Sequence, residues 1–388
     1  MLLLLPFALA LPPDQALPLP AGWSAGVDLV GADLDGDGLA EIALPGRPPT
    51  TPTAVSTLLY AWDGVAAAPL RRVAGLSVLT SPGDLDGDGT DELVLADAAN
   101  RRLIVAPGSP TGPSAARAYA LALGRGEALS AAGIGDADGD GLPDLGVCVA
   151  ETPQDPIRGP FYFHYAVFSG AGGGYAPRAG RVVQATALDV LGQAATRADV
   201  DGDGVQDLVL AIPNHSAPGL TLAGQILVVW GGARGVGPDV DTLDGPPSRE
   251  CGRALVSLGD PDGDGDDDVL FDCGAGVGER ELRHLEGGRG ALSWSQWSGG
   301  TWRAPRLATG DFDGDGRVDL AIGDAGANLA GGAVSLHLAA TPLGAPEAWR
   351  FDGAGGLGRA VALADVDGDG LDDLVAASLD GLSVWMGR

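Results

Sequence analysis

Short apolar runs alternate with turns rich in glycine, proline and aspartate along the chain, and the runs show no helical period. Three runs of strand length close the sequence, namely GRAVALAD, DDLVAAS and GLSVWMG. The same order occurs around Asp199 as GQAATRAD, DLVLAIP and GQILVVWGG, and a fourth run such as ARAYALAL or EAWRF precedes the next unit. Four short strands per unit predict the blades of a β-propeller, which is an all-β fold.

The turn after the first run of each unit carries a repeated acidic sequence. It reads DLDGDGLAEI from Asp33 and recurs six times. Successive first aspartates lie 51, 52, 63, 61, 51 and 54 residues apart, a period typical of blades or solenoid units. The chain is therefore a repeat protein from end to end. The recurrences are DLDGDGTDEL from Asp84, DADGDGLPDL from Asp136, DVDGDGVQDL from Asp199, DPDGDGDDDV from Asp260, DFDGDGRVDL from Asp311 and DVDGDGLDDL from Asp365.

The two ends of the repeat array indicate a closed ring. Enough chain for two strands follows the seventh acidic sequence, while one unassigned run, Ala16 to Pro20, precedes the first strand, Gly26 to Ala32. The N-terminal run supplies the missing outer strand of the last blade, which leaves no strand edge open. We therefore expect a seven-bladed β-propeller of four-stranded blades over residues 14–388, without an internal domain boundary. The alternative is a parallel solenoid, whose repeats are usually about 20 to 30 residues long.

The composition fits this fold and excludes several kinds of function. The 64 glycines and 28 prolines suit many turns, and 45% apolar residues are too many for a disordered chain. Lysine is absent, which excludes Schiff-base chemistry and a phosphate-loop lysine. The formal net charge of −29 argues against nucleic acid and anionic membrane surfaces as partners. Beyond the N-terminus, no stretch approaches the roughly 18 apolar residues of a membrane-spanning helix.

Two features bear on the cellular compartment. Residues 1–10, MLLLLPFALA, end in a small-x-small triplet that resembles the cleavage site of a secretory signal peptide. The segment is short and lacks a basic residue, so a frayed apolar terminus is the alternative. Of the three cysteines, Cys251 and Cys273 flank the fifth acidic sequence, where they either pair across a hairpin or remain two buried thiols. We expect a secreted, periplasmic or cell-surface protein.

Each acidic sequence has the donors of a calcium site. Carboxylates at positions 1, 3 and 5 of a tight loop point inward, the glycines at positions 4 and 6 allow backbone angles that a Cβ opposes, and position 9 returns a fourth carboxylate. With a main-chain carbonyl at position 7, these oxygen-only donors favour Ca²⁺ over zinc, copper or Mg²⁺. The predicted ligands of up to seven calcium ions are Asp33, Asp35, Asp37, Leu39, Glu41, Asp84, Asp86, Asp88, Thr90, Glu92, Asp136, Asp138, Asp140, Leu142, Asp144, Asp199, Asp201, Asp203, Val205, Asp207, Asp260, Asp262, Asp264, Asp266, Asp268, Asp311, Asp313, Asp315, Arg317, Asp319, Asp365, Asp367, Asp369, Leu371 and Asp373.

Two other interpretations of these loops fit the sequence less well. An EF-hand has helical flanks and a bidentate glutamate at position 12, which here is Leu44, Leu95 and Leu210 in the first, second and fourth repeats. Acidic turns without metal would hold four repelling carboxylates in each loop. The loops contain 28 of the 52 acidic residues, so seven divalent ions would change the charge from −29 to −15.

The acidic loops and their flanks resemble FG-GAP repeats, which build the integrin α-subunit propeller and bacterial VCBS-type repeat proteins. The resemblance covers roughly residues 14 to 388, with degraded FG and GAP signatures, and it is closer to the bacterial type. It implies a seven-bladed propeller with calcium in the loops that join the first two strands of each blade, and ligand contacts on the opposite rim. The flanking matches are Leu191-Gly192, Cys251-Gly252 and Leu357-Gly358 before the loops, and Ala43 to Pro45 and Ala211 to Pro213 after them.

The resemblance places three long loops on the ligand rim, residues 45–54, 150–160 and 213–223, with Arg47, Arg158 and His215 as candidate contacts. No catalytic constellation is predicted, because histidines 164, 215, 284 and 337 fall in different repeats. We expect a monomeric calcium-binding module, for binding or adhesion to an extracellular protein or glycan. The alternative is a propeller hydrolase or lyase acting on an extracellular polymer. Aromatic residues that stack on sugars or pack in strands are Phe161, Tyr162, Phe163, Tyr165, Trp294, Trp297 and Trp302.

Overall fold

The computed structural model describes most of the chain, and every regular element in the described part is a strand. No helix that could span a membrane occurs there. The described residues are 13–49, 55–62, 67–109, 113, 119–122, 126–133, 143–151, 162–169, 176–184, 194–232, 239–276, 278–286, 288, 292–297, 300–327, 331–338 and 347–388.

The strands form six four-stranded sheets and one five-stranded sheet. In chain order, the five-stranded sheet contains β2 (Ser24–Ala25), β3 (Val30–Ala32), β4 (Glu41–Arg47), β5 (Ser56–Trp62) and β6 (Ala67–Ala74). The next three contain β7 (Ser77–Thr80), β8 (Leu93–Asp97), β9 (Arg102–Ala106) and β10 (Tyr119–Ala122); β11 (Gly126–Gly133), β12 (Asp144–Glu151), β13 (Tyr162–Ser169) and β14 (Ala176–Gln184); β15 (Ala195–Ala198), β16 (Asp207–Ile212), β17 (Gln225–Val229) and β18 (Val240–Asp244). The last three contain β19 (Leu255–Gly259), β20 (Asp268–Gly274), β21 (Arg280–Glu286) and β22 (Ser293–Gln296); β23 (Arg306–Gly310), β24 (Asp319–Asp324), β25 (Ala333–His337) and β26 (Trp349–Asp352); β27 (Ala360–Ala364), β28 (Asp373–Ala377), β29 (Gly381–Trp385) and the N-terminal β1 (Gln15–Pro18).

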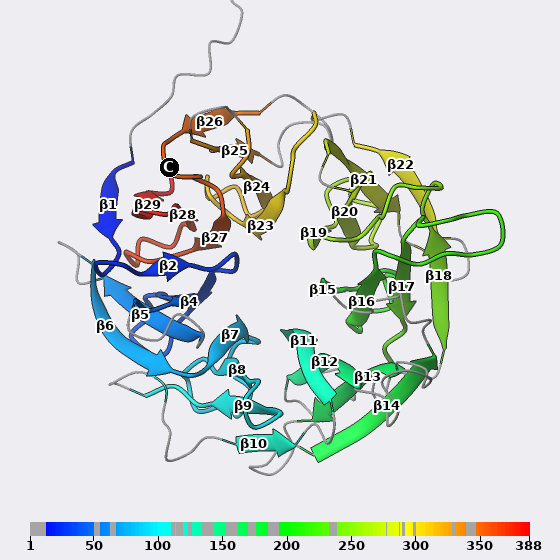
Figure 1. Ribbon diagram of the computed structural model, residues 1–388, viewed down its shortest axis with the longest axis horizontal. Coiled ribbons are helices and arrows are strands. Elements are labelled where there is room, and N and C mark those ends of the chain that lie inside the picture. Colours follow the sequence, from blue (N-terminus) through cyan, green and yellow to red (C-terminus); the bar gives the residue numbers. More distant parts are fainter. Residues whose placement is uncertain are drawn as a thin grey trace, which may run out of the picture.

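The sheets stand around a common axis as the blades of a β-propeller (Figure 1). The first strand of each sheet faces the centre, and the following strands pair antiparallel in sequence order toward the outside. The predicted all-β propeller is therefore confirmed. Six sheets have the predicted four strands and one has five, so the prediction of seven four-stranded blades is not met in full.

The extra strand arises because the predicted first strand, Gly26 to Ala32, is wrong in detail. β2 and β3 pair with the same strand, β4, but the register shifts by two residues between them, from Ala25 opposite Gly46 to Val30 opposite Ala43. Pro45 lies at this break, and proline has no N–H to donate to the ladder. The residues between β2 and β3 therefore bulge out of the sheet.

The N-terminal strand closes the ring as predicted. β1 pairs antiparallel with β29, with Gln15 opposite Val384 and Pro18 opposite Gly381. Asp14 accepts hydrogen bonds from the Met386 N–H at 3.0 Å and from the Arg388 guanidinium at 2.9 Å. The last sheet thus combines the two ends of the chain, and the edge of β29 is covered.

The core lies between neighbouring sheets. Second strands such as β16 and β28 are buried along their whole length, because both their faces pack against adjacent sheets. Between the last two sheets, the rings of Phe351 and Trp385 pack with centroids 4.4 Å apart. This packing holds the ends of the first strands, and so the acidic loops that follow them, in fixed positions.

Candidate metal centres

The acidic loops join the first and second strand of each sheet, where the resemblance placed them. The first loop connects β3 to β4 and the last connects β27 to β28. Of the third loop only Asp144 among the predicted ligands is described, and it is fully buried. Asp136, Asp138, Asp140 and Leu142 lie outside the described residues.

A shared set of local hydrogen bonds shapes the described loops. In the first loop, the Asp33 carboxylate accepts the N–H groups of Gly36 at 2.7 Å and Gly38 at 3.0 Å. Both glycines have positive φ, 76° and 87°, a region that disfavours any side chain. The predicted role of the two glycines is confirmed in all six described loops, since Gly87, Gly89, Gly202, Gly204, Gly263, Gly265, Gly314, Gly316, Gly368 and Gly370 also have positive φ.

The fifth-position carboxylate orients the seventh residue. Leu39 N–H donates to Asp37 Oδ1 at 2.9 Å, and the seventh residue of each other described loop makes the corresponding bond to the fifth carboxylate. The peptide groups that follow are thereby fixed. Coordination by the seventh-position carbonyls stays a prediction for Leu39, Thr90, Val205, Asp266, Arg317 and Leu371.

Carboxylates of different loop positions converge on one another. In at least five of the described loops, ligand oxygens of three acidic residues lie within 4.8 Å of one another. These groups are Asp33, Asp35 and Asp37; Asp84, Asp86 and Glu92; Asp199, Asp201 and Asp203; Asp260, Asp262 and Asp264; and Asp311, Asp313 and Asp315. Oxygens this close repel unless a proton or a cation lies among them.

The acid at position 9 is buried in each loop. Glu92 is fully buried, and its Oε2 accepts the N–H of Leu85 at 2.6 Å. Burial, helped by the charges of the neighbouring aspartates, raises the pKa of Glu92 to about 8, although the hydrogen bond from Leu85 opposes this rise. Burial likewise raises the pKa of Glu41 to about 7, of Asp207 to about 7 and of Asp373 to about 6. These pKa values indicate carboxylates that lack a positive partner.

Glu92 tests whether a cation fits the second loop. Its Oε1 is buried and accepts no hydrogen bond, although the residue belongs to the cluster with Asp84 and Asp86. Leaving a buried carboxylate oxygen unsatisfied is costly. Asp311 Oδ1 of the sixth loop is also buried without a hydrogen-bond donor. The oxygen-only donor set and these unsatisfied oxygens fit a hard divalent cation.

The fifth loop contains a contact that sequence reasoning missed. His284 Nε2, on β21, lies 3.0 Å from Oδ2 of Asp268, the ninth-position acid. Burial raises the pKa of Asp268, and His284 opposes that rise. The contact depends on the register of β20 and β21, which places His284 opposite Leu270. No sequence signal joins the two residues.

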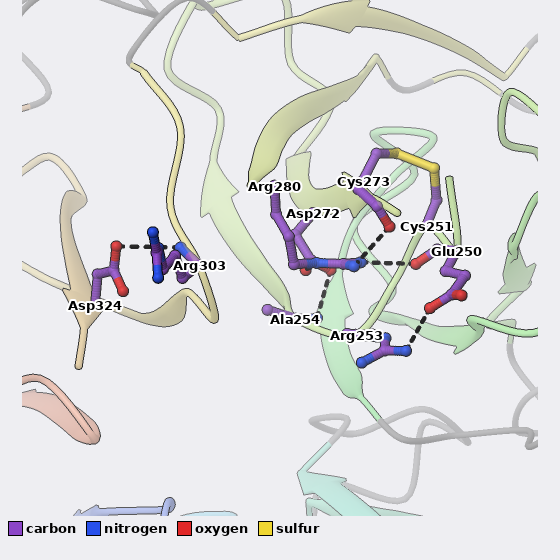
Figure 2. Close-up of polar contacts among 10 residues, drawn as sticks. Glu250, Cys251, Arg253, Ala254, Asp272, Cys273, Arg280, Arg303 and Asp324 are labelled. Carbon is purple, nitrogen blue, oxygen red and sulfur yellow. Dashed lines mark hydrogen bonds and ion pairs between the residues drawn. A yellow bond between two sulfur atoms is a disulfide. The ribbon is translucent and has the colours of Figure 1, made fainter. Parts of the chain in front are cut away.

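At the end of the fifth sheet opposite its acidic loop lies a buried network around a disulfide (Figure 2). Cys251 and Cys273, whose pairing the sequence left open, form a disulfide within the core between two sheets. Beside it, buried Arg280 forms an ion pair with Asp272 and donates to the carbonyl oxygens of Gly274 at 2.8 Å and Glu250 at 2.7 Å. The network ties the start of β21 to the segment before β19. Its role is therefore to hold this end of the sheet together.

The residues predicted to contact a protein or glycan differ in how exposed they are. Arg47 is the exposed last residue of β4, so the predicted loop 45–54 begins later than expected. The loop 213–223 joins β16 to β17, and its His215 lies 3.9 Å from Asp244. Trp297 and Trp302 are buried against each other, with ring centroids 5.7 Å apart, and are not available for sugar stacking. Trp294 on β22 packs under the Arg283 guanidinium.

Several other predicted residues cannot be placed. Arg158 and Phe161 lie outside the described residues, as do 152–160 of the loop 150–160. Tyr162, Phe163, His164 and Tyr165 belong to β13, and only their backbone is described. His164, His284 and His337 occupy third strands of their sheets, in agreement with the sequence pattern.

A cavity of about 280 Å³ lies among the first strands at the centre of the ring. Most of its lining residues have apolar side chains, but the area exposed to the cavity is mainly polar, and Asp28 from the bulge before β3 and Arg306 from β23 are opposite charges there. Burial raises the pKa of Asp28, and the Arg306 charge partly offsets that rise. Sequence reasoning did not identify this cavity. Its lining includes Asp28, Leu79, Ala131, Ala195, Arg253, Arg306 and Val361, with a contribution from every sheet.

Comparison with known families agrees with the geometry of the loops. The FG-GAP-like repeat family matches residues 84–147, which run from the first ligand of the second loop into β12. A comparison with curated proteins gives no match. The matched segment contains both Glu92 and Asp144, the buried ninth-position acids of two successive loops.

Proposed function

Because the chain is an FG-GAP-repeat β-propeller, a fold that serves as a binding module, we propose that it is a calcium-binding propeller that attaches to an extracellular protein or glycan. We count the five-stranded sheet as a seventh blade, since β2 and β3 both pair with β4 in place of a single first strand. The observation that carries the proposal is the buried Oε1 of Glu92, which has no hydrogen-bond donor and belongs to a cluster of three acids.

Calcium is the cation that best suits these loops. Four carboxylates and a main-chain carbonyl per loop offer the six to eight oxygen contacts that Ca²⁺ accepts, whereas Mg²⁺ requires a compact octahedral shell. Thiolates or imidazoles would indicate zinc or copper, and the predicted ligand set contains neither. Bound calcium would offset the charge of each cluster and complete the contacts of the buried oxygens.

We predict that the protein binds close to seven calcium ions. The measurement is metal analysis by mass spectrometry after equilibration in millimolar calcium and removal of free ion. The Asp201→Asn and Asp203→Asn double variant should lose one ion, because these residues supply only the fourth loop. As a matched control, Asp241→Asn on half-buried β18, outside the acidic loops, should keep the full number. A count of two ions or fewer in the unmodified protein would contradict the proposal.

Calcium affinity is expected to increase with pH between about 6 and 8. The raised pKa of Glu92, about 8, means that the metal-free folded protein holds a proton there at neutral pH, and calcium must displace it. Each displaced proton weakens apparent affinity by about tenfold per pH unit below the pKa. In metal-free protein, stability should fall as pH rises, because the folded state binds this proton more tightly than the unfolded state.

The pH prediction is checked by calcium titrations and thermal melts in EDTA. Metal-free protein should lose stability as pH rises from about 4.5, the ordinary glutamate pKa, to about 8. Calcium-saturated protein should not show this loss. Glu92→Gln cannot ionise and should reduce the pH dependence of both measurements. An affinity independent of pH would refute the assignment of the ninth-position acids as ligands.

We further propose that the protein acts outside the cytoplasm, in a secreted, periplasmic or surface location. The Cys251–Cys273 disulfide supports an oxidising compartment, and the apolar residues 1–10 support export. Sequencing the N-terminus of the mature protein tests export, since an intact Met1 on cytosolic protein would contradict it. Protein and glycan arrays probed with and without calcium test the binding function. If the protein bound no protein or glycan on the arrays, either with or without calcium, this result would argue against the binding function.

A further inference from the structure

Aspartate at position 8 of three loops reaches across to the preceding loop. Asp91 of the second loop accepts the N–H of Asp33, the first residue of the first loop, through Oδ2 at 3.0 Å. Its own N–H donates to the carbonyl oxygen of Asp33 at 2.7 Å. The backbone of Asp33, a predicted ligand, is therefore held on both sides by one residue of the neighbouring loop.

The same pair of bonds recurs twice. Asp267 accepts the Asp199 N–H at 2.8 Å and donates to the Asp199 carbonyl at 2.7 Å. Asp372 accepts the Asp311 N–H at 2.8 Å and donates to the Asp311 carbonyl at 2.9 Å. The joined loops are therefore the first with the second, the fourth with the fifth, and the sixth with the seventh.

We call the contact between two neighbouring acidic loops a joint. Two other described joints lack this carboxylate. Ala40 occupies position 8 of the first loop and donates its N–H to Asp365 of the seventh at 2.8 Å, but it has no side-chain acceptor. Val318 occupies position 8 of the sixth loop, next to the fifth. By sequence, position 8 is aspartate at three of the seven joints, and the other four have Ala40, Pro143, Gln206 and Val318.

Close backbone packing occurs at two of the three joints with aspartate, whereas Gly314 of the sixth loop and Gly368 of the seventh face the side chains of Leu371 and Leu39. A Cβ at Gly36 would lie 2.9 Å from the carbonyl oxygen of Gly89, and one at Gly202 would lie 2.7 Å from that of Gly265. Gly263 of the fifth loop, which faces the joint with Val318, has open space instead. At these two joints, the paired loops therefore leave no room for a side chain between their backbones.

We propose that Asp91, Asp267 and Asp372 are positioning residues that couple neighbouring metal loops, so that calcium binds cooperatively within three pairs of loops. This inference rests on the proposed function, because it assumes that the loops bind calcium. Asp91 lies between Thr90 and Glu92, both predicted ligands of the second ion. An ion in the second loop fixes this segment, and Asp91 then fixes the backbone of Asp33 for the first ion. By linkage, the first ion favours the second by the same factor.

The coupling is measured by hydrogen–deuterium exchange of the full chain during a calcium titration. Peptides covering residues 33–41 report occupancy of the first loop, and peptides covering 84–92 report the second. Removing second-loop ligands by Asp86→Asn with Asp88→Asn should raise the calcium midpoint of the first loop on the order of fivefold. Asp91→Ala, which keeps the predicted second-loop ligands, should raise the first-loop midpoint similarly. Combining the two changes should add little, because both break one connection.

Two controls separate coupling from general damage. Asp91→Asn retains a side-chain oxygen acceptor and should restore most of the coupling lost in Asp91→Ala. Asp313→Asn with Asp315→Asn empties the sixth loop, and the fifth-loop midpoint should stay unchanged, because Val318 offers no carboxylate at that joint. An unchanged first-loop midpoint in Asp91→Ala would overturn the coupling while leaving calcium binding intact. Absence of calcium-dependent protection in every loop would instead overturn the calcium proposal and the coupling with it.

Discussion

Calcium is expected to raise the melting temperature of the ring steeply, and magnesium much less. An ion that binds only the folded protein contributes about 1.4 kcal/mol at ten times its dissociation constant, so seven independent ions would contribute on the order of 10 kcal/mol. That value rivals the whole stability of a typical domain. The physical source is the repulsion among acids held within 4.8 Å, together with the buried oxygen of Glu92 that lacks a donor.

The measurement is a thermal melt in EDTA, in calcium and in magnesium at constant ionic strength. Constant ionic strength matters because added salt screens the exposed aspartates regardless of specific binding. The fourth-loop double variant, Asp201→Asn with Asp203→Asn, should recover part of the stability in EDTA, since it removes two charges, and should gain less from calcium. Equal melting temperatures in EDTA and calcium would show that the loops do not use the ion for stability.

Deleting residues 14–22 is expected to destabilise the calcium-bound ring by roughly 2–4 kcal/mol, the combined effect of one buried leucine and a lost strand ladder. The deletion removes β1 and with it Leu17, which is buried against the last sheet. The edge of β29 would then be open to pairing with other chains. Differential scanning calorimetry and light scattering should show a lower melting temperature and earlier association.

A matched variant isolates the strand from its terminal ion pair. Asp14→Ala removes the exposed contacts with Arg388 and the Met386 N–H but leaves the β1–β29 ladder intact. Exposed ion pairs contribute little, about 0–1 kcal/mol, so this variant should melt close to the unmodified protein. A deletion that melts as high as Asp14→Ala would show that ring closure by β1 contributes nothing to stability.

Local features of this fold were predictable from sequence. The strands around Asp199 match β15, β16 and β17 to within a few residues, because their apolar runs are short and bounded by turns. The loop geometry was predictable for a related reason. The hydrogen bonds that the Asp33 carboxylate accepts from the N–H groups of Gly36 and Gly38 span five residues or fewer, so the DxDGDG spacing alone determines them.

Features that join distant residues were not predictable. In the sequence, Asp91 cannot be distinguished from the other acids of its loop, because its hydrogen-bond partner Asp33 is 58 residues away. The disulfide and the Asp268–His284 contact depend on strand register, which the apolar pattern does not determine. The break between β2 and β3 follows from the missing N–H of Pro45 in β4. This proline affects the sheet only because β2 and β3 pair with β4 on either side of it.

Closure of the last sheet by β1 has a consequence for the order of folding. The other six sheets are formed by strands that follow one another in the chain, so each can form as soon as its own segment is available. β1 must wait for β29, and the Met386–Asp14 bond spans 372 residues. Ring closure is therefore the contact with the largest entropic cost and the last to form. Until then, a nascent or truncated chain exposes the edge of β29 and the apolar side of β1, which makes this intermediate the one most prone to aggregation.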